Sequence, residues 1–230
     1  MQTLPVIDTP SLAIAGSVTR FPVRRVYCVG RNYADHAKEM GASGREPPFF
    51  FFKPADALFN VAAGATENWP YPTLTQDLHH EVELVVAIGR GGRDITPDQA
   101  IDHIWGYAIG LDMTRRDLQA QMKKEAKPWC IGKGFDHGAP IGPLVPREVT
   151  GEIVAGPIQL EVNGERRQTG DISDMIWNIR EVIAHISKAW ELKPGDLIFT
   201  GTPAGVGAVN RGDVLSVQAT QVGGFSIRVV

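Results

Sequence analysis

The chain has 230 residues, of which 43% are hydrophobic and 21% charged, and its formal net charge is −3. This composition is that of a globular protein long enough to bury a full core, and it excludes wholesale disorder. Acidic and basic residues are mixed along the chain. A surface that binds a phosphate backbone needs clustered Lys and Arg, so we expect no nucleic-acid partner.

The first twenty residues contain no basic region followed by a continuous apolar stretch, which a signal peptide requires. No window reaches the roughly 18 uncharged apolar residues of a membrane helix, so we expect no membrane partner and a cytoplasmic protein. Cys28 and Cys130 can form one bridge at most. Buried free thiols in a reducing compartment are the expected state of both.

Turn-forming residues are frequent, with 25 glycines and 16 prolines, which favours many short strands over a helix bundle. Residues 1–22 are expected to form an N-terminal arm, and residues 23–230 a single main domain. Apolar runs and turn signals predict strands at residues 26–30, 49–52, 80–88, 105–111, 159–162, 165–168, 197–200, 214–219 and 225–230.

Two helices are expected, one over residues 33–40 and one over 176–190, where isoleucines and a valine recur at helical spacing. Asn163-Gly164 is the preferred two-residue turn of a β-hairpin between the strands on either side of it. Strands dominate and few alternate regularly with helices. The sequence therefore predicts a β-rich α+β fold rather than a doubly wound sheet.

Three carboxylates form the most informative pattern. Glu81 and Glu83 are two residues apart in a predicted strand, so they project from one face with their Cα atoms about 7 Å apart. Like charges held this close need a cation, a shared proton or free solvent. Asp112 follows the apolar run 105–111 and is the third candidate ligand for a hard dication such as Mg²⁺ or Mn²⁺. A solvated strand face has the same spacing and stays open as an alternative.

A zinc site is disfavoured, because the chain has no His-x-x-x-His pair and no Cys-x-x-Cys pair. His79 and His80 are adjacent and would face opposite sides of a strand. His36 and Glu39 are three residues apart on the predicted helix 33–40 and can touch. A carboxylate beside an imidazole fixes its tautomer and raises its basicity, which suits a base that activates water, although an ordinary surface pair has the same spacing.

Several cations and polar groups follow the predicted strands. Arg116 or Gln119 could hold a substrate carboxylate. Lys133, between two glycines, could stabilise an enolate or oxyanion or be an ordinary loop cation, and Lys53 has the same two interpretations. The glycine-rich turn 201–207 matches neither the Walker nor the dinucleotide pattern. It is either a structural loop or a carboxylate site made by backbone N–H groups and the Thr202 hydroxyl.

Six runs of the chain, in this order, resemble the fumarylacetoacetate hydrolase family: residues 30–39, 52–54, 80–84, 112–119, 133–136 and 200–207. They span nearly the whole chain from about Arg25. The runs 26–41 and 45–56, together with the length of the chain, are most similar to the fumarylpyruvate hydrolase branch of that family. The resemblance implies a rolled, mixed β-sandwich with few helices, paired as a homodimer.

The resemblance also implies a site. Mg²⁺ or Mn²⁺ would bind Glu81, Glu83 and Asp112, and the pattern does not distinguish the two ions. The expected catalytic residues are His36, Glu39 and Lys133. The expected contacts to an oxo acid are Arg116, Gln119 and Thr202, with Arg31 and Lys53 as further positions. Arg115 departs from the family, which often has a small residue there.

The implied activity is metal-dependent hydrolysis of a carbon–carbon bond in a 2,4-dioxo acid. Fumarylpyruvate, cleaved to fumarate and pyruvate during the breakdown of aromatic compounds, is the leading substrate. Other acylpyruvates, decarboxylation of oxaloacetate, and isomerisation or decarboxylation of a homoprotocatechuate-type dioate are alternatives within the family. A β-rich binding module, with the carboxylates as a structural metal site, is the non-enzymatic alternative.

Overall fold

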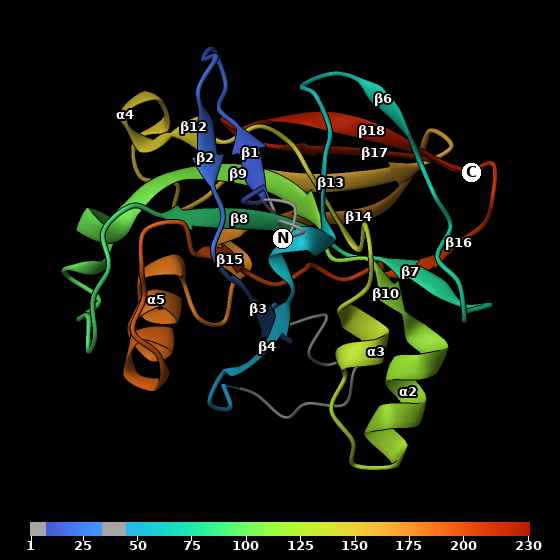
Figure 1. The fold of residues 1–230 in the computed structure, drawn as a ribbon, viewed down its shortest axis with the longest axis horizontal. Coiled ribbons are helices and arrows are strands. Elements are labelled where there is room, and N and C mark those ends of the chain that lie inside the picture. The colour runs from blue at the N-terminus through green and yellow to red at the C-terminus, as the bar shows by residue number, and fades with distance from the viewer. Residues whose placement is uncertain (1–7, 34–44) are drawn as a thin grey trace, which may run out of the picture.

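The computed structural model describes residues 8–33 and 45–230. Two β-sheets stacked on one another form the body of the protein (Figure 1). The larger sheet has the strand order β4-β3-β15-β8-β9-β11-β5, with β12 paired to β9, and the smaller has the order β14-β13-β17-β18-β6. Both sheets contain parallel and antiparallel pairs, such as β15 parallel to β3 and antiparallel to β8. The predicted β-rich α+β fold is confirmed.

The strands of the larger sheet are β3 (Val26–Gly30), β4 (Phe49–Lys53), β5 (Leu58–Asn60), β8 (Val82–Ile88), β9 (Ile104–Leu111), β11 (Ala139–Ile141), β12 (Val145–Pro146) and β15 (Leu197–Phe199). Those of the smaller sheet are β6 (Thr66–Trp69), β13 (Pro157–Val162), β14 (Glu165–Asp171), β17 (Val214–Ala219) and β18 (Gly223–Val229). Two further small sheets pair β1 (Ser11–Ala13) with β2 (Arg20–Pro22), and β10 (Thr114–Arg115) and β16 (Gly207–Val209) with β7 (Leu78–His80).

The α-helices are α2 (Arg116–Lys124), α3 (Cys130–Lys133), α4 (Arg147–Thr150) and α5 (Ile179–Ala189). Short 3₁₀ helices are η1 (Ala55–Ala57), η2 (Ala100–His103) and η3 (Ile172–Asp174). Helices α2 and α3 pack side by side next to β10, at the lower right of Figure 1. None of the helices described here is long and apolar enough to cross a membrane.

Strand β8 explains how the chain builds two cores. All seven of its residues are buried, which is typical of a strand covered on both faces. Because side chains alternate along a strand, Val82, Leu84, Val86 and Ile88 enter the large core between the sheets. Val85 and Ala87 point the other way, into a second core. Glu83 has the same parity as this second set, so it faces away from the smaller sheet.

The N-terminal hairpin closes the second core. Leu12 of β1 and Phe21 of β2 are buried there against Val26, Val85 and other residues of the larger sheet. The described part of the expected arm 1–22 is therefore a hairpin packed on the main domain. The Leu144 carbonyl accepts a hydrogen bond from the Ala15 N–H at 2.8 Å, which fixes the position of the hairpin.

The predicted strands are found, with ends shifted by one or a few residues, except that residues 80–88 are interrupted at Glu81. The hairpin turn is confirmed, with φ of 55° at Asn163 and 80° at Gly164. The predicted helix 33–40 lies outside the described residues apart from Tyr33.

Three expectations need correction. Helix α5 begins at Ile179 and not at residue 176, because Asn178 and Glu181 form a capping box there. Helix α2 was not expected; its only buried residue is Gln119, so it has no apolar stripe for a periodicity to reveal. Both cysteines are free as predicted, but Cys130 is exposed, at the start of α3.

Candidate metal centre and substrate cavity

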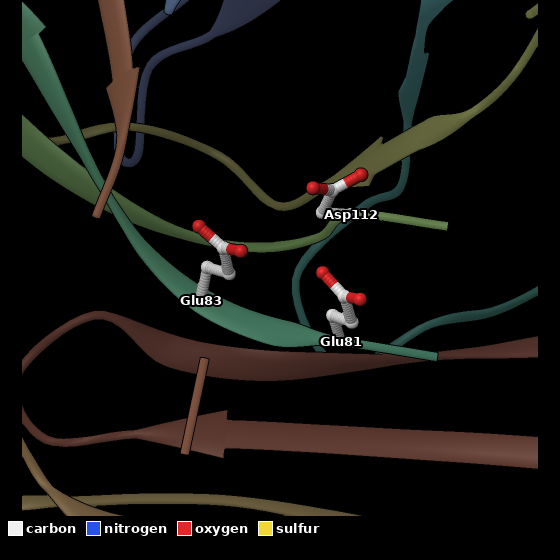
Figure 2. Close-up of side chains that lie close together, drawn as sticks. All are labelled: Glu81, Glu83 and Asp112. Atoms are coloured by element: carbon white, nitrogen blue, oxygen red, sulfur yellow. The ribbon is translucent and has the colours of Figure 1, made fainter. Parts of the chain in front are cut away.

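The antiparallel pairing of β8 and β9 brings the three carboxylates together. Val82 pairs with Leu111, so Asp112 lies opposite Glu81, and the Asp112 N–H donates to the Glu81 carbonyl at 2.8 Å. Figure 2 shows the side chains of Glu81, Glu83 and Asp112 converging from these two strands. One oxygen of each carboxylate lies within 4.8 Å of the others, and all three residues are buried. The solvated strand face is thereby excluded.

The environment of Glu83 favours a bound cation. Its carboxylate is 2% exposed and accepts a 2.7 Å hydrogen bond from the Gly201 N–H. Burial, with Asp112 and Glu81 nearby, raises the pKa of Glu83 well above its usual range. No ion pair reaches Glu83 from the described residues. A buried carboxylate beside two others needs the positive charge that a divalent ion supplies.

Asp112 is also suited to bind a divalent metal ion. Its Oδ2 accepts a hydrogen bond from Lys133. Its Oδ1 lies 2.8 Å from Lys53 Nζ, but the angles are those of an ion pair and not of a hydrogen bond. A lone pair of Oδ1 therefore stays available at the centre of the cluster. Three clustered carboxylates are the kind of oxygen donor set that Mg²⁺ and Mn²⁺ prefer.

Lys133 lies between two of the carboxylates. From α3 its ammonium donates to Glu81 Oε2 at 2.8 Å, to Asp112 Oδ2 at 2.7 Å and to Thr114 Oγ1 at 2.7 Å. Burial alone would lower the pKa of Lys133, but Asp112 and Glu81 outweigh it and raise the pKa above its usual value. Lys133 is therefore charged at neutral pH, and it acts through its positive charge and not as a base.

Lys53 lies behind the cluster. Besides its contact with Asp112, its ammonium donates to the Met113 carbonyl at 3.0 Å and to the Lys133 carbonyl at 2.5 Å. These two hydrogen bonds and the ion pair hold the ammonium within the protein, and Lys53 is 1% exposed. A contact between Lys53 and substrate stays a prediction.

A small cavity opens over the carboxylates. The described residues around it combine charged groups on the floor with an aromatic wall: Val29, Gly30, Arg31, Phe49, Phe51, Glu81, Glu83, Arg116, Gln119, Trp129, Lys133 and Thr202. Arg31 adopts a left-handed backbone conformation, with φ of 54°, directly after β3. The structure therefore brings Arg31, Arg116, Gln119 and Thr202 to one cavity.

Helix α2 presents a connected pair of these residues. Arg116 donates from Nη2 to Glu81 Oε1 at 2.5 Å and from Nη1 to Gln119 Oε1 at 2.6 Å. The guanidinium thus neutralises part of the carboxylate charge and fixes the amide of Gln119. Thr202 donates its hydroxyl hydrogen to the Val82 carbonyl at 2.8 Å. Its role toward a substrate, like those of Arg116 and Gln119, stays a prediction.

Arg115 does not line the cavity among the described residues. Its guanidinium carbon lies 4.5 Å from the centre of the Phe135 ring, and Nη1 donates to the Ile131 carbonyl at 3.2 Å. Arg115 therefore braces α3 from outside the cavity, and its size has no direct effect on what the cavity holds.

His36 and Glu39 lie outside the described residues, so the predicted water-activating pair is not placed. Conversely, sequence reasoning missed Thr114, His80 and Gln168, which are buried and hydrogen-bonded around the carboxylates. Thr114 lies within a polar run that was noted, but nothing in the sequence distinguishes Gln168 from the other polar residues of its hairpin.

A family model described as fumarylacetoacetate hydrolase, C-terminal, matches residues 25–230. The chain belongs to this family. A solved fumarylpyruvate hydrolase from Pseudomonas aeruginosa, in complex with Mn²⁺ and pyruvate, is 55% identical with a TM-score of 0.97, and the match covers 100% of this chain and 99% of that one.

Two curated relatives carry other names. The oxaloacetate tautomerase YcgM of Escherichia coli is 43% identical over 203 residues, which is 88% of this chain and 91% of the relative. The oxaloacetate decarboxylase of Dictyostelium discoideum is 40% identical over 197 residues, 86% of this chain and 89% of the relative. The family fold thus supports more than one reaction on oxo acids.

Proposed function

We propose that the protein hydrolyses a carbon–carbon bond of a 2,4-dioxo acid, with fumarylpyruvate as the leading substrate. One observation carries the proposal: a buried cluster of three carboxylates shares a cavity with Lys133 and Arg116. Such a cavity can hold a divalent ion and an anionic substrate together. The similarity to a fumarylpyruvate hydrolase solved with Mn²⁺ and pyruvate supports this choice of substrate.

Glu81, Glu83 and Asp112 would hold Mg²⁺ or Mn²⁺, which supplies Lewis-acid polarisation of the oxo and carboxylate oxygens. The Gly201 N–H keeps the Glu83 carboxylate turned toward the cluster. Arg116 and Gln119, already joined by a hydrogen bond, would orient the substrate carboxylate. The aromatic wall of Phe49, Phe51 and Trp129 would exclude bulk water from the acyl half.

His36, with Glu39 as its partner, would take a proton from water as the water attacks the carbonyl distal to the 2-oxo acid. The bond between that carbonyl carbon and the methylene carbon then breaks, and its electron pair stays with the pyruvate half. The charged ammonium of Lys133 stabilises this negative charge. Protonation of the methylene carbon yields pyruvate, and the acyl half leaves as fumarate.

Oxaloacetate is the second candidate substrate, for tautomerisation or decarboxylation, because the curated relatives are named for these reactions. Both reactions need stabilisation of an enolate, which Lys133 and a divalent ion supply equally, but neither needs an attacking water. The two candidates therefore differ in their dependence on His36 and Glu39.

The decisive experiment compares turnover of fumarylpyruvate and oxaloacetate by the purified protein, with Mg²⁺, with Mn²⁺ and after EDTA. Loss of the fumarylpyruvate ultraviolet absorbance, with fumarate and pyruvate formed in equal amounts, is expected only when the metal is present. A kcat/KM for oxaloacetate at least tenfold above that for fumarylpyruvate would assign the second function instead.

Two variants sharpen this comparison. Glu83→Gln should lose metal and turnover together, whereas Glu67→Gln, an exposed residue of β6, should change neither. His36→Ala should abolish hydrolysis of fumarylpyruvate while leaving Mn²⁺ affinity nearly unchanged. If Glu83→Gln retained its metal content and its turnover, the metal-dependent mechanism built on this carboxylate cluster would be wrong.

We also infer that the protein acts as a homodimer in the cytoplasm, with no nucleic-acid or membrane partner, as the sequence suggests. Light scattering on a size-exclusion column tests the dimer: an eluting mass near 25 kDa, that of a single chain, would contradict it. Comparison of kcat/KM with each ion at equal saturation would decide between Mg²⁺ and Mn²⁺.

A further inference from the structure

Gln168 is a buried amide in a strand that contributes nothing else to the site. It is the only buried residue of β14, which lies at the edge of the smaller sheet, and it is 0% exposed. No described residue that lines the cavity comes from the smaller sheet. The side chain of Gln168 nevertheless reaches across to the larger sheet, where it contacts the segments that carry Glu81 and Glu83.

The amide makes four hydrogen bonds. Its Oε1 accepts from the Val82 N–H at 3.1 Å and lies 2.9 Å from His80 Nδ1. Its Nε2 donates to Thr202 Oγ1 at 2.7 Å and to the Pro203 carbonyl at 2.8 Å. A backbone N–H only donates and a carbonyl only accepts, so Val82 and Pro203 fix which end of the amide is which. His80 must then carry its hydrogen on Nδ1.

These four partners occupy two places that matter for the carboxylates. His80 and Val82 are the residues before and after Glu81, at the break between β7 and β8. Thr202 and Pro203 follow Gly201, whose N–H donates to Glu83. One side chain therefore ties the strand break at Glu81 to the turn that holds Glu83.

We propose that Gln168 is a positioning residue for the metal centre and for oxo-acid binding. It holds Glu81 and the turn 201–203 at a fixed separation, so that the carboxylates are arranged for a divalent ion before the ion binds, and Thr202 is oriented toward the cavity. The part that concerns the metal rests on the carboxylate cluster, and the part that concerns the oxo acid rests on the proposed function.

The energetic cost of the arrangement supports a specific role. A buried amide is tolerated only when its polar atoms are hydrogen-bonded, and Gln168 satisfies all four of its main valences. Supporting groups of this kind orient metal ligands, and their loss commonly costs 10- to 100-fold in metal affinity. A residue that served packing alone could be apolar, like its cross-strand partner Leu160.

The test is Gln168→Met, which keeps the volume and removes all four hydrogen bonds. Mn²⁺ binding is measured by calorimetry, and the electron paramagnetic resonance spectrum of bound Mn²⁺ reports ligand geometry without substrate. We expect the Mn²⁺ Kd to rise at least tenfold, with a changed spectrum. The matched control, Gln218→Met on the exposed side of β17, should keep the wild-type values.

A lower Tm with wild-type Mn²⁺ affinity and an unchanged spectrum would show that Gln168 only stabilises the fold, and would overturn the proposal. Gln168→Glu decides the matter if the methionine variant does not fold. It keeps both accepted bonds beside Glu81 but loses at least one donated bond to the turn.

For Gln168→Glu we expect no loss of Mn²⁺ affinity and at least a fivefold weaker Kd for pyruvate in the Mn²⁺-loaded protein. Wild-type pyruvate binding would refute the positioning role. Both readouts are independent of turnover, so failure of the proposed hydrolysis would not be mistaken for failure of this inference.

Discussion

Replacing Lys133 with methionine tests the charge balance of the site directly. Lys133 is buried and contacts Glu81 at 2.8 Å and Asp112 at 2.7 Å. Removing one partner of a buried ion pair leaves an uncompensated charge in a region of low dielectric and costs about 3–5 kcal/mol. In EDTA, we therefore expect the free energy of unfolding of Lys133→Met to fall by about that amount.

Mn²⁺ should reverse much of this loss. A ligand present at 100 times its Kd stabilises the folded state by about 2.7 kcal/mol, and by more if its Kd is lower. Lys133 repels a dication and occupies one oxygen each of Glu81 and Asp112. Its removal should leave the Mn²⁺ Kd equal to or below that of the wild type, while turnover is lost.

The assay is urea unfolding followed by circular dichroism, at one protein concentration, in EDTA and in excess Mn²⁺. Lys127→Met is the matched control: Lys127 is exposed and paired with Glu125, so its loss should cost less than about 0.5 kcal/mol in either condition. A tenfold weaker Mn²⁺ Kd in Lys133→Met, or a stability in EDTA within about 1 kcal/mol of the wild type, would refute the reasoning.

Three further predictions follow from single residues. Because the pKa of Glu83 is raised, protons compete with Mn²⁺ for its carboxylate, so the Mn²⁺ Kd should fall as pH rises. A Kd that calorimetry found to be the same across the pH range would contradict this. Burial lowers the pKa of His80 to about 4 from 6.5. As pH falls, the His80 imidazole is therefore protonated in the unfolded chain at a higher pH than in the folded protein. In EDTA the wild type should therefore lose about 3 kcal/mol relative to His80→Gln between about pH 7 and pH 4, and parallel stability curves would show that His80 is not buried as a neutral group. Gly201→Ala should cost about 1–3 kcal/mol and weaken Mn²⁺ binding, since φ is +100° and the new Cβ would lie 2.7 Å from the Cβ of Asn32. Gly212→Ala is the control, because Gly212 has a similar φ of +94° but open space around it. If urea unfolding gave both variants the same loss of stability, the contact with Asn32 would be unimportant.

Local pattern was sufficient to predict the central strands and the grouping of the carboxylates. The apolar run 84–88 identified β8, and the Glu-x-Glu spacing predicted two carboxylates on one face, which the structure confirms. The partnership of Asp112 depends on the register of β8 with β9, which spacing within one strand does not contain. Asp112 was a candidate because it follows the apolar run 105–111, and the family resemblance implied the same ligand.

Long-range contacts explain what the sequence did not reveal. Gln168 and the carboxylates are joined across two sheets, from a strand whose other residues are polar and more exposed. Helix α2 has only three apolar residues, none of them fully buried, and its buried contact is made by Gln119. The break at Glu81 needs the strands that flank β7 on both sides, β10 and β16, and neither was predicted.

Two buried lysines and the partly buried Arg116 pair with the carboxylates and affect which ligands the site can hold together. With all carboxylates ionised, Glu81, Glu83 and Asp112 carry three negative charges. The described residues that form ion pairs with the cluster, Lys53, Lys133 and Arg116, carry three positive charges. A divalent ion thus creates an excess of two positive charges in a medium that opposes net charge. A dianionic oxo acid restores neutrality, so ion and substrate should each strengthen the binding of the other. The singly charged product, pyruvate, would then dissociate before the divalent ion does, and its dissociation would weaken the binding of that ion.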